Sequence, residues 1–176
     1  KKGDRSNRKN NAGAHVNDAP EAQPVLVFTY GNPSRGDDAL GPAMYDQLYQ
    51  NPMDRVELQT DFQLQIEHAL DFESREFILF IDAGTDCQAP FELRRLVPER
   101  DDSYTTHSMS PSSLLAVYRQ LKRREPPQAW LLTIRGYDFG LGKALSENAL
   151  SNLFSAHNYL VRHPPWQRSV SHCGGG

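Results

Sequence analysis

The chain has 176 residues, which suits one domain built around a single hydrophobic core. Its formal net charge is -3 and its basic residues are scattered, so nucleic acid is not expected as a partner, because a phosphate backbone attracts clustered lysine and arginine. No apolar run reaches the ~18 residues of a membrane helix, and two cysteines are too few for a disulfide framework. We therefore expect a cytoplasmic protein with no membrane partner.

The first 23 residues are polar and show no apolar period. Such a segment cannot bury enough apolar surface to offset the entropy lost on ordering. We therefore predict a flexible extension over residues 1–23.

The first predicted strand, Val25–Tyr30, is apolar on both faces and leads into the loop Gly31–Asp38. In open α/β sheets ligands bind at the carboxyl ends of the strands, so this loop is a candidate for function. It has neither the G-x-G-x-x-G spacing of a dinucleotide loop nor the G-K-[ST] of a P-loop. Its two carboxylates would also repel a pyrophosphate, so the sequence disfavours nucleotide binding.

Asp37 and Asp38 stand where the first helix begins, and two interpretations are open for them. One is capping, since an acid at a helix start binds free N–H groups and interacts favourably with the helix dipole. One aspartate satisfies that need and Pro42 keeps the helix from starting much earlier. We therefore favour a ligand-binding role for Asp38.

Helical periodicity follows, with Leu40, Met44 and Leu48 on one face of the first helix. A strand is predicted at Val56–Thr60. A shorter second helix comes next, and its predicted inward residues are Phe62, Ile66, Ala69 and Leu70. Its polar residues Gln63, Glu67 and His68 are expected on a solvated face.

The next buried strand, Phe77–Ile81, is followed directly by Asp82, which should lie at the same sheet edge as Asp38. An aspartate after a buried strand is most often a turn former or a cap, and for Asp82 taken singly this interpretation and a functional role are equally open. Cys87 is expected to be a half-buried apolar residue, since no nearby histidine would activate its thiol. Phe91–Val97 alternates apolar and polar residues as an edge strand does.

His107 lies in the loop that leads to a third helix, where Ser110 is the predicted N-cap and Pro111 the first helical residue. A lone histidine there is usually an ordinary polar loop residue. The predicted inner face of the helix consists of Leu114, Tyr118 and Leu121. A buried strand follows at Ala129–Ile134, and the segment Tyr137–Phe139 after it is expected to line the cleft.

The last helix is predicted from Ser146 to about Arg162, with inward residues Leu150, Leu153, Phe154, Leu160 and Val161. Residues 164–176 are expected to form a flexible tail, which leaves 24–163 as the folded domain. Because buried strands alternate with helices, the sequence predicts an α/β fold, a three-layer sandwich around a mostly parallel sheet.

Taken together, Asp38, Asp82 and His107 form a candidate metal site. Two carboxylates and one imidazole suit a borderline divalent cation such as nickel, and they leave coordination positions for water or substrate.

Three pieces of the sequence together resemble the hydrogenase maturation endopeptidases: Gly31–Gly41 (GNPSRGDDALG), Ile81-Asp82-Ala83, and His107 before a Ser-Pro helix start. The resemblance covers residues 25–163. It includes Gly136, Phe139, Gly142, Leu145 and Ser146 ahead of the last helix.

The resemblance implies an α/β/α sandwich around a twisted five-stranded sheet. Members of the family remove a short C-terminal peptide from the large subunit of a nickel-iron hydrogenase after nickel insertion. The nickel-binding acids and histidine of the family align with Asp38, Asp82 and His107. The implied enzyme is a nickel-dependent endopeptidase, aspartic-type by family classification, and we expect it to be a monomer. Its nickel would arrive with the precursor, so no resident metal is expected, and Asp38 or Asp82 would accept the proton of the attacking water.

Two alternatives stay open at this point. One is a chaperone-like module that recognises the nickel-loaded precursor without cutting it. The other is a nucleotide-dependent enzyme on a similar sheet, against which the missing phosphate loop argues. The sequence does not identify the hydrogenase, although Gln63–His68 resembles members that serve soluble NAD-linked enzymes.

Overall fold

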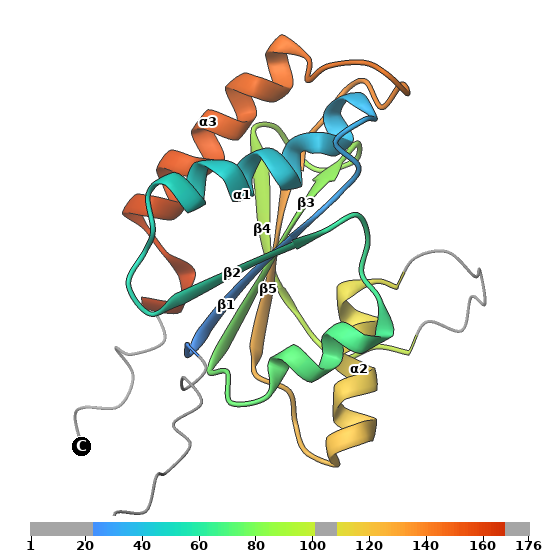
Figure 1. The fold of residues 1–176 in the computed structure, drawn as a ribbon, viewed down its shortest axis with the longest axis vertical. Coiled ribbons are helices and arrows are strands. Elements are labelled where there is room, and N and C mark those ends of the chain that lie inside the picture. The colour runs from blue at the N-terminus through green and yellow to red at the C-terminus, as the bar shows by residue number, and fades with distance from the viewer. Residues whose placement is uncertain (1–22, 101–108, 168–176) are drawn as a thin grey trace, which may run out of the picture.

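The computed structural model describes residues 23–100 and 109–167. They form a five-stranded sheet in the order β2-β1-β3-β5-β4, parallel except for β4, with helices on both faces (Figure 1). In chain order the elements are β1 Val25–Tyr30, the 3-10 helix η1 Gly36–Ala39, α1 Leu40–Gln50, β2 Val56–Asp61, the 3-10 helix η2 Ile66–Phe72, β3 Phe77–Gly84, β4 Phe91–Leu96, α2 Pro111–Lys122, β5 Gln128–Arg135 and α3 Glu147–Arg162. This confirms the predicted fold class.

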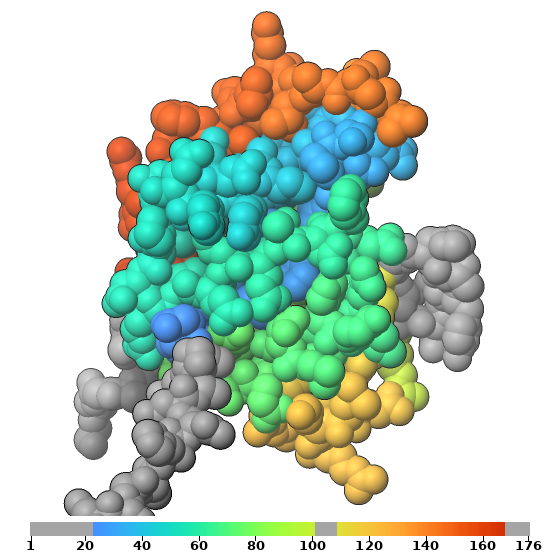
Figure 2. All heavy atoms as spheres, in the orientation of Figure 1, coloured from blue at the N-terminus to red at the C-terminus, as the bar shows by residue number. Residues whose placement is uncertain are grey.

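The central strands are apolar throughout because their side chains alternate between two cores. On one face Val27 and Leu79 pack under α1 and α3. On the other face Leu26 and Phe80 pack under η2 and α2. Figure 2 shows α3 in orange and red lying against α1 in cyan, so these two helices together cover the first face.

The predicted strands agree with the structure to within a few residues. The largest difference is in β3, which runs on to Gly84 and therefore contains Asp82. Phe91–Leu96 is the antiparallel edge strand, as its alternating pattern predicted.

The helix starts were predicted better than the helix faces. Ser110 caps α2 and Ser146 caps α3, each accepting a hydrogen bond from a backbone N–H in the first turn. Some predicted inward residues are wrong, because Leu121, Leu150, Phe154 and Val161 are exposed. The buried stripe of α3 instead includes Ala149 and Ala156, small side chains that let α3 approach the sheet and α1 closely.

The inner face of the second helix was predicted correctly at Ala69 but not at its other predicted residues. It is a 3-10 helix, in which residues three apart are aligned, and it buries Ala69 and Phe72 together with Leu64 before it. The predicted inward residues Phe62, Ile66 and Leu70 are exposed.

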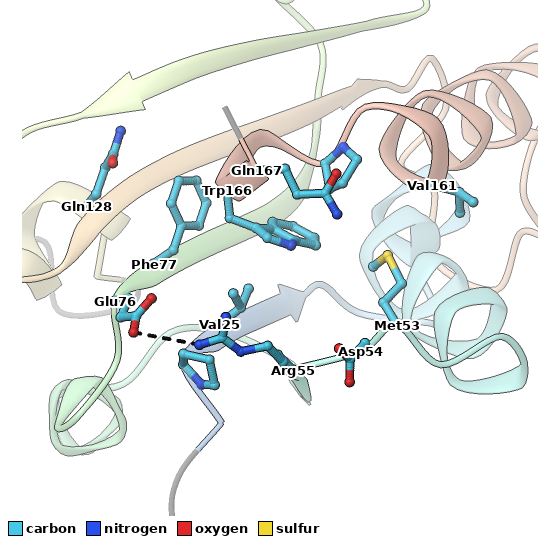
Figure 3. A pocket seen from close by; sticks show the side chains of 12 residues that line it. Val25, Met53, Asp54, Arg55, Glu76, Phe77, Gln128, Val161, Trp166 and Gln167 are labelled. Carbon is cyan, nitrogen blue, oxygen red and sulfur yellow. Dashed lines mark ion pairs between the residues drawn. The ribbon is translucent and has the colours of Figure 1, made fainter. Parts of the chain in front are cut away.

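A pocket of about 500 Å³ opens at the amino ends of the strands, the edge opposite Asp38 and Asp82 (Figure 3). Trp166 packs on Phe77 there with ring centroids 6.0 Å apart, and Arg55 pairs with Glu76 at 3.8 Å on the rim. Neither Asp38 nor Asp82 lines this pocket. The predicted extension and most of the predicted tail lie outside the described residues, so the domain boundaries stay predictions. No helix within the described ranges has the length and apolar character needed to cross a membrane.

Candidate active site

The loop between β1 and η1 is held by a segment a hundred residues later in the chain. Gly36 has φ +55°, and a Cβ on it would lie 2.3 Å from the carbonyl oxygen of Asp138. Its N–H donates to the carbonyl of Lys143 at 3.0 Å, and the N–H of Asp37 donates to the carbonyl of Asp138 at 2.7 Å. The loop therefore has one position relative to the segment after β5.

Asp37 is fully buried, and its carboxylate accepts four hydrogen bonds. Oδ2 accepts from the N–H groups of Tyr137 at 2.7 Å and Asp138 at 3.0 Å and from Ser146 Oγ at 2.8 Å, while Oδ1 accepts from Ser146 N at 2.7 Å. Burial alone would raise the pKa of Asp37, but these hydrogen bonds outweigh it and hold the pKa below its usual value. Asp37 is therefore a structural anchor.

The prediction that one of the two aspartates caps the first helix is wrong. The N-cap residues of η1 and α1 are Arg35 and Ala39, and neither side chain accepts a capping hydrogen bond from the helix. The carboxylate of Asp37 instead binds Ser146, the N-cap residue of α3.

Asp38 is half-buried and lies in η1, which follows the carboxyl end of β1. Its Oδ2 accepts from the N–H of Asn32 at 2.9 Å, which fixes the side chain over the turn. Its negative charge raises the pKa of Asp82. The structure thus brings two of the three predicted ligands, Asp38 and Asp82, within electrostatic reach of each other.

Asp82 has few hydrogen-bond donors. Its Oδ1 accepts from the N–H of Ala83 at 2.7 Å, and the hydroxyl of Tyr30 hydrogen-bonds to the same carboxyl group. Burial, together with the charge of Asp38, raises the pKa of Asp82 to about 7 despite these two donors. Burial and the neighbouring Asp82 also raise the pKa of Tyr30.

The pairing of the strands places polar side chains next to one another in a row across the carboxyl ends of the strands. Tyr30 is paired with Asp61 on β2, and the next pair after Thr29–Ile81 brings Tyr30 beside Asp82. The row continues from Asp82 to Thr133 and Glu92. Because cross-strand neighbours share a face, the row lies on the face covered by η2 and α2, against which Tyr30 packs.

The third predicted ligand, His107, lies outside the described residues. Within residues 23–100 and 109–167 no group of three or more histidine, cysteine or acidic side chains could hold a metal ion. The donor chemistry of the two aspartates still fits a divalent cation. Each carboxylate has one oxygen fixed by a backbone N–H, and a cation between them would relieve the repulsion that raises the pKa of Asp82.

His68 is not on a solvated face, so that prediction is wrong. Its Nε2 lies 3.2 Å from Asp61 Oδ2, and its Nδ1 accepts from the N–H of Gln65 at 3.0 Å. Its ring packs on Phe28 with centroids 4.6 Å apart. Both nitrogens are therefore engaged in holding η2 on the sheet. Gln63 and Glu67 are exposed as predicted.

Cys87 is buried, and burial raises the pKa of its thiol, in agreement with an unreactive apolar role.

Sequence reasoning missed Tyr30, Thr133 and Glu92. Tyr30 ends a predicted strand and could have been found there, but its pairing with Asp82 depends on strand register, which the sequence does not show.

No family model and no curated protein matches the sequence. Solved structures do match it. The endopeptidase HybD from E. coli has a TM-score of 0.64 at 19% identity, covering 83% of this chain and 93% of that one. The [NiFe] hydrogenase maturation protease HycI from Thermococcus kodakarensis KOD1 has a TM-score of 0.62 at 16% identity, covering 80% and 91%. A hydrogenase 3 maturation protease has a TM-score of 0.61 at 21% identity, covering 80% and 90%. The chain therefore has the fold of these proteins over most of its length.

Proposed function

We propose that this protein is an endopeptidase that removes a short C-terminal peptide from the nickel-loaded precursor of a [NiFe] hydrogenase large subunit. The observation that carries the proposal is the pair Asp38 and Asp82, whose carboxylates interact at the carboxyl edge of the sheet. The pair lies on a fold shared with proteins named as hydrogenase maturation proteases. We also expect a cytoplasmic monomer whose partner is the precursor.

In this proposal nickel is part of the substrate, and Asp38, Asp82 and His107 bind it as it arrives with the precursor. Nickel would supply Lewis acidity at the bond to be cut. The backbone N–H groups of Asn32 and Ala83 orient the two carboxylates by holding one oxygen of each. The lone pairs of these oxygens that no protein donor uses would bind the ligand.

Asp82 is the better candidate for proton transfer. In the metal-free protein its pKa of about 7 leaves Asp82 partly protonated at neutral pH, and nickel binding would release that proton and leave a carboxylate that can accept another. In its ionised form it would take a proton from the attacking water and pass it to the leaving amine. Tyr30 would hold the carboxyl group in place through its hydroxyl.

Mass spectrometry of a large-subunit precursor from the same organism tests the proposal. The precursor is incubated with the protein, with and without nickel, and the expected result is a shortened product only when nickel is present. Asp38→Asn, Asp82→Asn and His107→Ala should abolish the product. Asp46→Asn is the matched control, because Asp46 is exposed on α1.

The outcomes separate the alternatives. Cleavage of nickel-free precursor at the full rate would contradict the dependence on nickel. Tight binding of loaded precursor without any shortened product would contradict the peptidase and favour the chaperone-like module.

A further inference from the structure

The pocket at the amino ends of the strands is apolar inside and charged at its rim (Figure 3). Its volume of about 500 Å³ is within the range of pockets that bind ligands. Three of its lining side chains, Met53, Phe77 and Trp166, belong to the core on the face covered by α1 and α3. The pocket is therefore an opening into that core, on the opposite edge of the sheet from the candidate active site.

The chain after α3 leads directly into this pocket. Pro164 and Pro165 are buried, and Trp166 packs on Phe77 with ring centroids 6.0 Å apart. The N–H of Gln167 donates to the carbonyl of Pro164 at 3.1 Å, which closes a turn at the pocket wall. Trp166 and Gln167 both line the pocket, so the segment that begins at residue 168 starts beside it.

The chain before β1 is held toward the other face of the sheet. The carbonyl of Gln23 accepts a hydrogen bond from the guanidinium of Arg75 at 2.6 Å. Arg75 also donates to the carbonyl of Asp71 in η2 at 3.0 Å and pairs with Glu57 at 2.7 Å. The residues on either side of Glu57 pack against the core under α1 and α3, so Glu57 itself is on the η2 face. The segment that starts at the pocket is therefore 168–176, which lies outside the described residues.

The rim of the pocket carries more negative than positive charge. Asp54, Arg55 and Glu76 are exposed there. Arg55 pairs with Glu76 at 3.8 Å, whereas Asp54 forms no ion pair within the described part of the chain. The sequence of residues 168–176, RSVSHCGGG, has one arginine, one histidine and no acid. Its side-chain charge is therefore opposite in sign to that of the rim.

We propose that residues 168–176 fold back into this pocket, with Val170 packed on Trp166. Val170 is three residues beyond the end of the described chain, a span of at most ~10 Å, so it stays within reach of the pocket. Its side chain would cover apolar surface that the open pocket leaves in contact with water. Arg168 would then lie at the rim beside Asp54. The inference does not rest on the proposed function, because the pocket is remote from the edge where cleavage is proposed.

NMR spectroscopy of the full chain tests the proposal. The expected result is nuclear Overhauser contacts from the Val170 methyl groups to the Trp166 ring. The Ser171 amide should exchange at least about tenfold more slowly than in a free peptide of the same sequence, as expected for burial of one valine side chain. Arg168→Gln should weaken this protection by up to about fivefold, the effect of one exposed ion pair.

Val170→Asp should raise the exchange of the Ser171 amide to the free-peptide rate, because a carboxylate is costly to bury in an apolar pocket. Val97→Asp is the matched control and should leave Ser171 protected, since Val97 is exposed and does not line the pocket.

Exchange of Ser171 at the free-peptide rate in the wild-type protein, or equal protection in Val170→Asp, would overturn the proposal. A mixed sample of differently labelled molecules identifies the occupant. Contacts between Val170 and Trp166 that appear only between molecules would also overturn it, because a second copy would then fill the pocket. Neither measurement involves cleavage, so the inference and the proposed function succeed or fail separately.

Discussion

Asp37 and Asp82 are two carboxyl groups on one fold with opposite environments. Asp37 is fully buried and Asp82 half-buried, yet Asp37 accepts four hydrogen bonds and its pKa falls. Asp82 has one backbone donor and one phenol and faces the charge of Asp38, so its pKa rises to about 7. The difference shows that the number of hydrogen-bond donors around a carboxyl group, rather than how deeply it is buried, decides whether its charged form stabilises the fold.

The neighbouring residues Asp37 and Asp38 also differ in how many hydrogen bonds their carboxylates accept from the protein. Asp37 accepts four hydrogen bonds from the protein, whereas the carboxyl group of Asp38 accepts one from Asn32 and that of Asp82 accepts two, from Ala83 and Tyr30. Groups left with unfavourable electrostatics in a folded protein are candidates for binding or catalysis, because a ligand relieves the repulsion.

Asp37→Asn should have the largest effect, lowering the free energy of unfolding at pH 7 by about 3–5 kcal/mol, because about two hydrogen bonds to a charged group are lost at about 1.5–3 kcal/mol each. An amide there would turn an N–H₂ group toward donors that need an acceptor. Because the folded pKa of Asp37 is lowered, its stabilisation is present above pH 3.8 and is lost as the pH falls through the folded pKa. Urea unfolding from pH 7 to pH 3 measures this. A loss below 1 kcal/mol, like that expected for Asp46→Asn, would contradict the anchor role.

Asp82→Asn should act in the opposite direction and stabilise the protein. A carboxyl whose pKa rises from 3.8 to about 7 binds its proton more tightly in the folded state, so stability falls as the pH rises between these values. Removing the charge should raise the free energy of unfolding by up to about 4 kcal/mol at pH 8 and by nothing below pH 4. The same variant should yield no shortened precursor. Equal stability of both proteins at pH 8 would show that Asp82 is not destabilising.

Ser146→Ala should cost about 1–2 kcal/mol, because it removes both the cap of α3 and one hydrogen bond to Asp37. Ser110→Ala is the matched comparison, since Ser110 caps α2 without touching a carboxylate. Thermal or urea unfolding of both variants measures the difference. If Ser110→Ala costs as much as Ser146→Ala, the bond to Asp37 adds nothing to the cap.

Tyr30→Phe should have the smallest effect on stability, within about 1 kcal/mol. In this variant the pKa of Asp82 should rise above 7, because the Tyr30 hydroxyl lowers that pKa in the wild-type protein. A carbon-13 NMR titration of the Asp82 carboxyl group measures this shift. An unchanged titration curve would mean that the hydroxyl does not hold Asp82.

Much of the fold could be predicted from apolar runs, because strands buried on both faces leave a clear pattern in Val25–Tyr30 and Phe77–Ile81. The face of α3 could not, since Ala149 and Ala156 carry a weak signal and the larger Leu150 and Phe154 are exposed. A close approach between helices favours small residues over the most hydrophobic ones.

The meeting of Asp38 and Asp82 at one edge of the sheet could be predicted from the sequence, but the different environments of Asp37 and Asp38 could not. Asp37 and Asp38 are indistinguishable in the sequence, and contacts with Tyr137 and Ser146 decide which one is buried. The pairing of Tyr30 with Asp82 depends on strand register. His107 stays a prediction, because it lies outside the described residues.

The hydrogen bonds of Asp37 join residues that are 100 to 109 positions apart. During synthesis on the ribosome, the loop that carries Asp38 emerges long before the chain that completes it. Contacts of such long range form late in folding because a large loop must close first. The edge that carries Asp38 and Asp82 is therefore completed only once most of the polypeptide has been made, and an incomplete chain does not yet bring these two carboxyl groups into their final positions.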